Sequence, residues 1–210
     1  MKIVVLNGSP RKKWNTSQVL NSFKEGVIET NQNITIKEIN LYDYKFTGCR
    51  SCFACKLKRF EDLPLECRIN DDIHDLLVEC RNADAIIIGS PIYFLDLSAQ
   101  LKAFLERLMY PGKSSKTIPC YILLTMNATE EAYEKAILPS VNVIVGYWNG
   151  NFGYTPKVTC FYDTYQRDSE EIYKKSSHDM SSKKIRHDAI WKDELLRAKE
   201  AGKKFMKEVM

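Results

Sequence analysis

The sequence predicts an α/β protein built on a doubly wound parallel sheet with helices on both faces. Short apolar runs alternate with stretches of helical periodicity over most of the 210 residues. This alternation favours parallel strands, because each parallel connection needs a crossover that covers one face of the sheet. Turn-forming residues follow the apolar runs directly, as in Gly8-Ser9-Pro10 and Ser90-Pro91. We therefore expect one domain spanning residues 1–210, with a five-stranded sheet.

The first two strands are expected at residues 2–6 and 34–40. The first is an apolar run that ends in a turn, which is typical of a buried parallel strand, and the second alternates in part. A helix should lie between them, with Thr16 or Ser17 capping its first free amides. The apolar positions of that helix share one face: Leu20, Phe23 and Val27.

The middle of the chain adds a long loop and the most apolar strand. Residues 46–70 hold four of the seven Cys and show neither helical nor strand periodicity of apolar residues, so we interpret them as a loop, called the cysteine loop below. A short helix should open at Asp71-Asp72, where carboxylates favour the positive end of the helix. Residues 85–89 predict the third strand. The following helix, over residues 97–108, places Arg107 off its apolar stripe.

Two further strands complete the expected sheet, at residues 118–125 and 158–162. A helix is expected over residues 130–145, and the last helix over residues 191–209. Residues 163–186 are polar, rich in Lys and Ser, and without period, so they predict a surface insertion.

Composition and charge narrow the class of protein. The chain has 31 Lys and Arg against 27 Asp and Glu, and a net charge of +4 spread along the sequence does not indicate nucleic-acid binding. The apolar runs fall far short of the roughly 18 residues that a membrane span needs. Residues 2–7 are too short for a signal peptide, so we expect a cytoplasmic protein without membrane partners. Its seven Cys then favour reduced thiols or metal ligation over a disulfide framework.

The loop after the first strand is rich in groups that bind phosphate. In an open α/β sheet, ligands lie beyond the carboxyl ends of the strands. Here the hydroxyls of Ser9, Thr16 and Ser17 would converge on a phosphate monoester. The Arg11 guanidinium and the first amides of a helix would meet the same group. The loop lacks G-x-x-x-x-G-K-[ST] and G-x-G-x-x-G, which argues against a nucleoside triphosphatase and a dinucleotide-binding loop.

The loop after the third strand is apolar and aromatic where such loops are normally polar. Tyr93 and Phe94 are expected to pack on a flat ring, while the backbone of residues 91–94 hydrogen-bonds the edge of that ring. A phosphate loop on the first strand and an aromatic loop on the third flank the switch point of the flavodoxin-type strand order 2-1-3-4-5. Together the two loops indicate flavin mononucleotide (FMN).

Three ordered motifs carry a resemblance to a known family. They are Gly8-Ser9-Pro10-Arg11 with Asn15-Thr16, Gly48-Cys49-x-x-Cys52-x-x-Cys55 with Cys67 and Asp71-Asp72, and Ser90-Pro91-Ile92-Tyr93 with Ser98 to Phe104. Over residues 1–130 the chain resembles the NADPH-dependent FMN reductase family with a flavodoxin-like fold, and within it the cysteine-containing branch similar to iron-sulfur flavoproteins. Trp14 departs from the family pattern, which usually has a small residue before Asn-Thr.

The resemblance implies where the cofactor binds. The residues implied for the FMN phosphate are Ser9, Arg11, Asn15, Thr16 and Ser17. Those implied for the isoalloxazine ring are Pro91, Ile92, Tyr93 and Phe94, with a third contact at Thr125, Met126 and Asn127. No side chain is expected to be catalytic, because the flavin carries the chemistry. The resemblance also implies a homodimer or a higher homo-oligomer.

Four cysteines fall close together in the sequence: Cys49, Cys52, Cys55 and Cys67. Three interpretations stay open for them. A [4Fe-4S] cluster suits the C-x2-C-x2-C spacing with a remote fourth Cys. Tetrahedral zinc ranks last, because zinc sites usually pair two separate C-x2-C knuckles. Loop thiols without metal, beside FMN alone, are preferred to the cluster. The other three cysteines are expected to be buried core residues: Cys80, Cys120 and Cys160.

These features lead to three hypotheses for function. The preferred one is an FMN-dependent oxidoreductase that takes electrons from NAD(P)H and passes them to a small acceptor, such as a quinone or another flavin. The second is an electron carrier that holds FMN together with a [4Fe-4S] cluster. The third is a flavodoxin-like binding module without catalytic activity.

Overall fold

The computed structural model describes residues 1–166 and 180–210. Five parallel strands form the sheet: β1 (Lys2–Asn7), β2 (Thr35–Asn40), β3 (Ala85–Tyr93), β5 (Cys120–Thr125) and β6 (Lys157–Phe161). Their order is β2-β1-β3-β5-β6, which confirms the expected order 2-1-3-4-5 of the five main strands. A short additional strand, β4 (Asp96–Leu97), pairs antiparallel with the end of β3.

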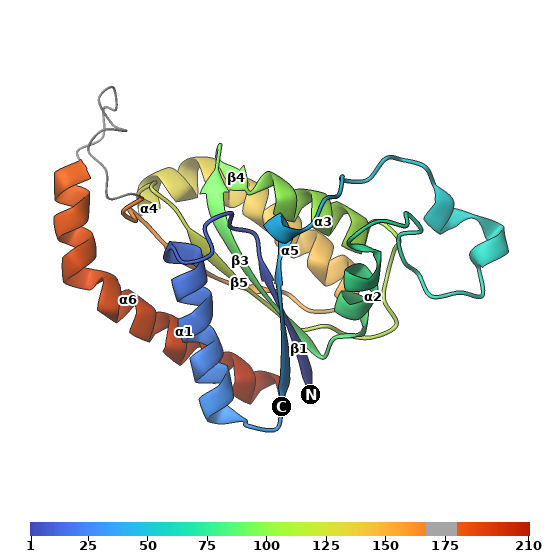
Figure 1. Cartoon of the computed structure of the whole chain (residues 1–210), viewed down its shortest axis with the longest axis horizontal. Coiled ribbons are helices and arrows are strands. Elements are labelled where there is room, and N and C mark those ends of the chain that lie inside the picture. The colour runs from blue at the N-terminus through green and yellow to red at the C-terminus, as the bar shows by residue number, and fades with distance from the viewer. Residues whose placement is uncertain (167–179) are drawn as a thin grey trace.

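Helices cover both faces of the sheet (Figure 1). The helices on one face are α1 (Asn15–Thr30) and α6 (Met180–Val209). Those on the other face are α2 (His74–Asn82), α3 (Ala99–Met109) and α5 (Leu138–Phe152). Two short segments lead into α5: α4 (Glu130–Ala132) and the π-helical η4 (Tyr133–Ile137). The expected α/β fold with helices on both faces is therefore confirmed.

Strand β1 shows how the sequence divides the core into two layers. Successive side chains of a strand point to opposite faces of its sheet. Ile3 and Val5 accordingly pack with the apolar face of α1, whereas Val4 and Leu6 pack with residues of α3. All four side chains are fully buried.

The bounds of β3 and of the last helix differ from the expectation for identifiable reasons. β3 continues past Gly89 to Tyr93, because β4 pairs with its last two residues and extends the ladder. Phe94 and Leu95 form the turn between them with φ of 51° and 64°, the left-handed backbone of a tight hairpin. The last helix begins at Met180, so the end of the expected insertion 163–186 is helical. Residues 167–179 of that insertion lie outside the described part of the chain.

Two glycines allow α1 and α6 to pack in close contact. A Cβ at Gly26 would lie 2.0 Å from the carbonyl oxygen of Lys199, and one at Gly202 would lie 2.2 Å from that of Phe23. Backbone atoms cannot yield as a flexible side chain can, so a methyl group must push the helices apart. We expect Gly26→Ala to lower the free energy of unfolding by about 2 kcal/mol or more, measured by urea denaturation.

The matched control is Gly150→Ala on α5, where an added Cβ meets nothing within 4 Å. Alanine is the better helix former, so this variant should be about 0.5 to 1 kcal/mol more stable than the parent protein. If the two variants changed the stability equally, the close contact between α1 and α6 would be refuted.

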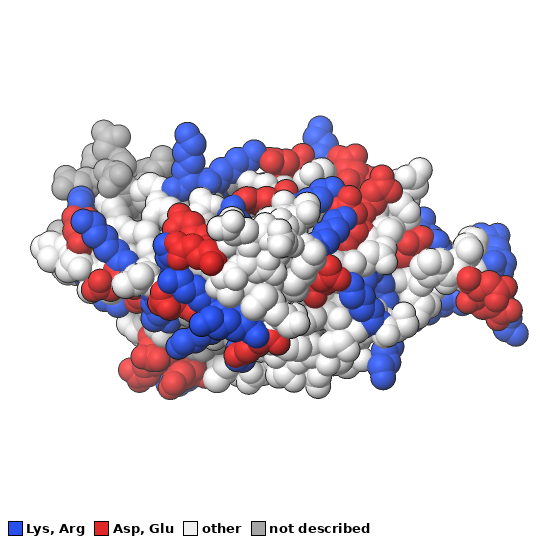
Figure 2. Space-filling model, turned by 90° about the horizontal axis from the view of Figure 1, so that it is seen from below, with Lys and Arg blue, Asp and Glu red and all other residues white. Residues whose placement is uncertain are grey.

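The cysteine loop, residues 46–70, projects from the body of the molecule (Figure 1). It contains two short 3-10 helices, η2 (Ala54–Lys56) and η3 (Lys58–Phe60), and a third, η1 (Leu41–Asp43), precedes it. Figure 2 shows basic and acidic side chains interspersed on one face of the molecule, in keeping with the net charge of +4. Among residues 1–166 and 180–210, no helix has the length and apolar character that a membrane span requires.

Candidate functional site

A hollow lies where β1, β3 and β5 end at the same edge of the sheet. We call it the strand-end hollow. Its lining residues are Ser9, Arg11, Trp14, Asn15, Thr16, Pro91, Ile92, Tyr93, Thr125, Met126, Thr164 and Gln166. Nine of these are residues that the sequence assigned to FMN, contributed by the ends of three different strands. The fold therefore brings together loops that are more than 100 residues apart in the sequence.

Three of the assigned residues do not line the hollow. Ser17 lies behind the first loop, where its hydroxyl donates to the Arg11 carbonyl at 3.2 Å and accepts from Asn7 Nδ2 at 2.9 Å. Phe94 is fully exposed at the tip of the β3–β4 hairpin. Asn127 accepts hydrogen bonds from the Lys183 ammonium group of α6.

The first loop is held by hydrogen bonds that form a compact turn. Asn7, which ends β1, is almost fully buried, and its Oδ1 accepts from the Ser9 amide at 2.9 Å. The Ser9 hydroxyl then accepts from the Arg11 amide at 3.1 Å. Gly8 lies tightly against α3, because a Cβ there would be 3.0 Å from the Leu101 Cβ. These contacts fix the backbone that leads into α1.

The start of α1 is fixed by contacts to the other strand ends. Asn15 Nδ2 donates to the Tyr165 carbonyl at 2.7 Å. The hydroxyl of Thr16 lies 2.7 Å from that of Thr125, the last residue of β5. The expected capping by Thr16 or Ser17 is wrong: the helix begins at Asn15, with Trp14 at the N-cap and no side-chain hydrogen bond to the first turn. The hydroxyls are instead used to hold neighbouring loops together.

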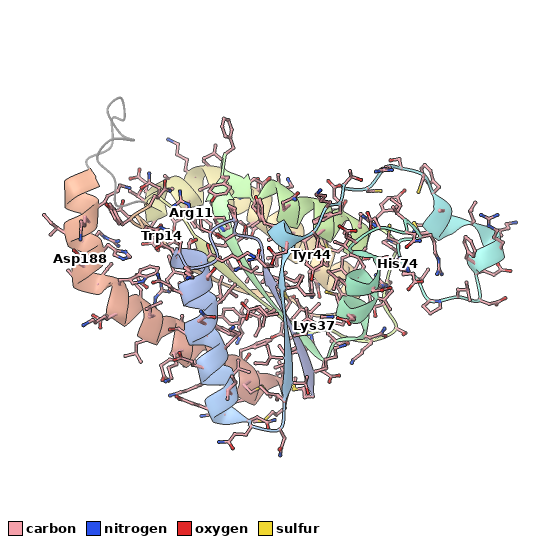
Figure 3. The ribbon with its side chains drawn as sticks, in the orientation of Figure 1. Arg11, Trp14, Lys37, Tyr44, His74 and Asp188 are labelled. Atoms are coloured by element: carbon pink, nitrogen blue, oxygen red, sulfur yellow. The ribbon has the colours of Figure 1, made fainter. Side chains whose placement is uncertain are left out.

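Arg11 and Trp14 both line the hollow, and Figure 3 shows them close together at the beginning of α1. The Arg11 guanidinium lies 5.9 Å from the centre of the Trp14 ring and donates to the Gln166 carbonyl. Three residues line the hollow that the sequence did not predict for the site: Trp14, Thr164 and Gln166. A signal for the last two was available, because they follow β6 and ligands gather beyond the carboxyl ends of such strands.

The segment after β6 is connected to α6 by ion pairs. Lys183 Nζ lies 2.6 Å from Asp163 Oδ1 and donates to the Asn127 carbonyl at 2.8 Å. Arg186 also reaches the Asp163 carboxylate, at 3.6 Å. α6 therefore holds the loops that follow β5 and β6, which supply Met126 and Thr164 to the hollow.

A second hollow brings the clustered cysteines together. We call it the cysteine pocket. Its lining residues are Cys49, Cys52, Phe53, Cys55, Cys67, Arg68, Ile69, Arg107, Tyr110 and Pro111. All four clustered cysteines thus face one space, and all are free thiols. Among the residues that the structure describes, no three His, Cys, Asp or Glu side chains are close enough together to hold a single metal ion.

Arg107 of α3 connects both ends of the cysteine loop. Its side chain is fully buried, and its guanidinium pairs with both carboxylate oxygens of Asp71, at 2.6 and 3.0 Å. Nε donates to Cys67 Sγ at 3.3 Å, and the remaining donors reach the carbonyls of Thr47 and Ile69 at 3.3 and 3.2 Å. All five guanidinium N–H groups are therefore used.

The electrostatics of Arg107 follow from this set of partners. Burial by itself would lower the pKa of Arg107, but its hydrogen bonds to Asp71 and Cys67 outweigh burial and raise that pKa. A permanent positive charge consequently lies at the wall of the cysteine pocket. Such a charge favours the anionic thiolate of a nearby cysteine over its neutral thiol.

The three cysteines outside the cluster are core residues, as expected. Cys80 and Cys120 are fully buried and Cys160 nearly so. Burial raises the pKa of all three thiols.

Comparison with known proteins shows what the chain is similar to. The family model described as NADPH-dependent FMN reductase matches residues 1–130. An iron-sulfur flavoprotein of Methanocaldococcus jannaschii is 37% identical over 111 residues, which is 51% of this chain and 51% of that relative. The chain thus covers about half the length of that relative. An iron-sulfur flavoprotein of Archaeoglobus fulgidus is 29% identical over 164 residues, 74% of this chain and 70% of that protein.

Among solved structures, an NAD(P)H:quinone oxidoreductase from Methanothermobacter marburgensis superimposes with a TM-score of 0.64. The match has 20% sequence identity and covers 97% of this chain and 96% of that one. At this identity the likeness concerns the fold alone.

Proposed function

Because the chain belongs to the NADPH-dependent FMN reductase family, we propose that it is an oxidoreductase that binds FMN in the strand-end hollow. The observation that carries this proposal is the meeting of three strand ends in one hollow. The lining residues come from the loop after β1, whose residues were predicted to bind phosphate, and from the ends of β3 and β5. A crevice beyond the strand ends, at the switch point of the strand order, is where such sheets bind ligands.

The chemistry of the lining residues suits FMN. The described residues around the hollow include hydroxyls, amides and the Arg11 guanidinium but no carboxylate, so nothing there repels a phosphate dianion. The first amides of α1, which lack a side-chain cap, favour the same anion. The end of β3 contributes apolar and aromatic side chains to the hollow, from Pro91, Ile92 and Tyr93. Such a surface suits a flat ring.

The chain's own residues would bind and orient the cofactor. We propose that Ser9, Arg11 and Thr16 hold the phosphate, and that the end of β3 positions the ring. Bound FMN supplies electron transfer between a reduced donor and an oxidised acceptor. The proposed donor is NAD(P)H and the proposed acceptor a small molecule such as a quinone or another flavin. The expected homodimer stays a prediction.

The phosphate assignment is tested with Arg11→Ala. A charged hydrogen bond contributes about 1.5 to 3 kcal/mol, so we expect this variant to bind FMN about tenfold to a hundredfold more weakly. The measurement is the Kd of the apoprotein for FMN, from quenching of flavin fluorescence. Lys12→Ala is the matched control, because Lys12 is exposed, pairs with Asp43 and does not line the hollow. Equal FMN affinities in the two variants would contradict the assignment.

A second candidate function adds an iron-sulfur cluster in the cysteine pocket. Two observations favour it: the four clustered cysteines line one hollow, and the matched curated relatives are named iron-sulfur flavoproteins. Four thiolates of a [4Fe-4S] cluster each bind a different iron, so they need not all reach one ion. A bound cluster would supply one-electron transfer. The four thiols would hold it, and Arg107 would fix Cys67 by its hydrogen bond.

A further inference from the structure

Trp14 occupies an unusual position for a tryptophan. It is the N-cap residue of α1, with an extended backbone at φ −103° and ψ −170°, and its side chain does not cap the first turn. It lines the strand-end hollow beside Asn15 and Thr16. Figure 3 shows it next to Arg11 at the beginning of α1. Its side chain therefore belongs to the wall of the proposed cofactor site.

The indole nitrogen of Trp14 lacks a partner in the part of the chain that the structure describes. Nε1 is buried from solvent and makes no hydrogen bond to residues 1–166 or 180–210. A buried polar group without a partner is rare and costs free energy, so a bound molecule that supplies the partner is favoured. Tryptophan is a donor only, which means that the missing partner must be an acceptor.

The surroundings of Trp14 indicate which acceptor it is. The Arg11 guanidinium lies 5.9 Å from the centre of the indole ring, and Ser9 and Thr16 line the same hollow. The described lining residues include no carboxylate. A cation, hydroxyls and a helix N-terminus thus surround one space, and Trp14, whose N–H group is unused, lines that space beside them. A phosphate dianion carries only acceptors and would satisfy all of these donors together.

We propose that Trp14 Nε1 donates a hydrogen bond to the FMN phosphate and thereby helps the protein to select FMN over riboflavin. The inference rests on the proposed function, because it requires FMN in the strand-end hollow. It assigns a role to Trp14, which stands where the family pattern usually has a small residue before Asn-Thr.

The test is Trp14→Phe, which removes the N–H group and keeps an aromatic ring. We expect the apoprotein of this variant to bind FMN about tenfold more weakly than the parent protein, while its Kd for riboflavin changes less than about twofold. Both values come from quenching of flavin fluorescence. A loss that is equal for FMN and riboflavin would assign Trp14 to ring or ribityl packing and overturn the proposal, as would unchanged FMN affinity.

A second measurement does not depend on the folding of the variant. In the ¹⁵N-labelled parent protein, FMN should shift the indole N–H resonance of Trp14 downfield, and riboflavin should leave it near its position in the apoprotein. Comparison with Trp191→Phe helps to assign the resonance, because the Trp191 indole already donates to Gln18. A Trp14 resonance that FMN does not move would overturn the proposal.

Failure of the proposed function has a different outcome from failure of this inference. If the parent protein bound no FMN at all, the proposed function would fail and the inference with it. If the parent protein bound FMN tightly and Trp14→Phe bound it equally well, the inference alone would fail.

Discussion

Arg107→Ala should lower the free energy of unfolding by about 3 kcal/mol, because removing one partner of a buried ion pair leaves the other charge uncompensated. Arg107 is only 1% exposed, and it bonds to Asp71, to Cys67 and to two backbone carbonyls. Its loss would remove the hydrogen bonds by which α3 holds Thr47, Cys67 and Ile69 of the cysteine loop. The measurement is urea denaturation of the apoprotein under reducing conditions.

Lys102→Ala on the same helix is the matched control. Lys102 pairs with Asp96 at 2.6 Å, but its side chain is 42% exposed. Solvent-exposed ion pairs on a protein surface contribute about 1 kcal/mol or less to stability, so the free energy of unfolding of this variant should differ little from that of the parent protein. If Arg107→Ala lowered the free energy of unfolding no more than Lys102→Ala, the buried contacts of Arg107 with the cysteine loop would not stabilise the protein.

Cys55→Ser should abolish iron binding if the cysteine pocket holds a [4Fe-4S] cluster. We expect about four irons per chain in the parent protein and fewer than about one in the variant, because the serine hydroxyl is a poor substitute for a thiolate ligand. Iron and acid-labile sulfide are assayed after purification without oxygen. The flavin that we propose for the strand-end hollow should be retained.

Cys80→Ala provides the control for that experiment. Cys80 is fully buried in the core on α2 and does not line the cysteine pocket. Its replacement should leave the iron content unchanged. Equal iron content in the Cys55 and Cys80 variants would contradict the cluster, and so would a parent protein without iron.

The main layers of the fold were predictable because they depend on local patterns. The apolar run at residues 2–6 and the helical stripe at Leu20, Phe23 and Val27 are both buried as expected. The β3–β4 hairpin was not predictable, because β4 has two residues and its turn places Phe94 and Leu95 in a left-handed backbone. Such positions normally hold Gly or Asn.

Arg107 shows a different limit of sequence patterns. It lies off the apolar stripe of α3, where a charged residue is normally exposed to solvent. The structure buries it, because Asp71 and the cysteine loop supply acceptors for every one of its donors. Periodicity within a helix contains no information about a loop that is distant in the sequence.

The candidate site was predictable to the extent that the strand ends define it. Ser9, Pro91 and Thr125 were assigned from three separate loops, and the structure places them around one hollow. Phe94 was expected at the ring because of its aromatic character and the resemblance to the family, yet it is fully exposed at the hairpin tip. Trp14 was seen only as a departure from a family pattern. The role that we propose for it rests on the unpartnered Nε1, which a sequence cannot show.

The most direct test of FMN binding in the strand-end hollow is an ultraviolet-visible spectrum of the protein purified without oxygen, with the flavin released and identified. The structure predicts flavin absorption bands and about one FMN per chain, either as isolated or after addition of FMN to the apoprotein. A colourless protein that fails to take up added FMN would contradict the proposal. That result would favour a flavodoxin-like binding module without the cofactor.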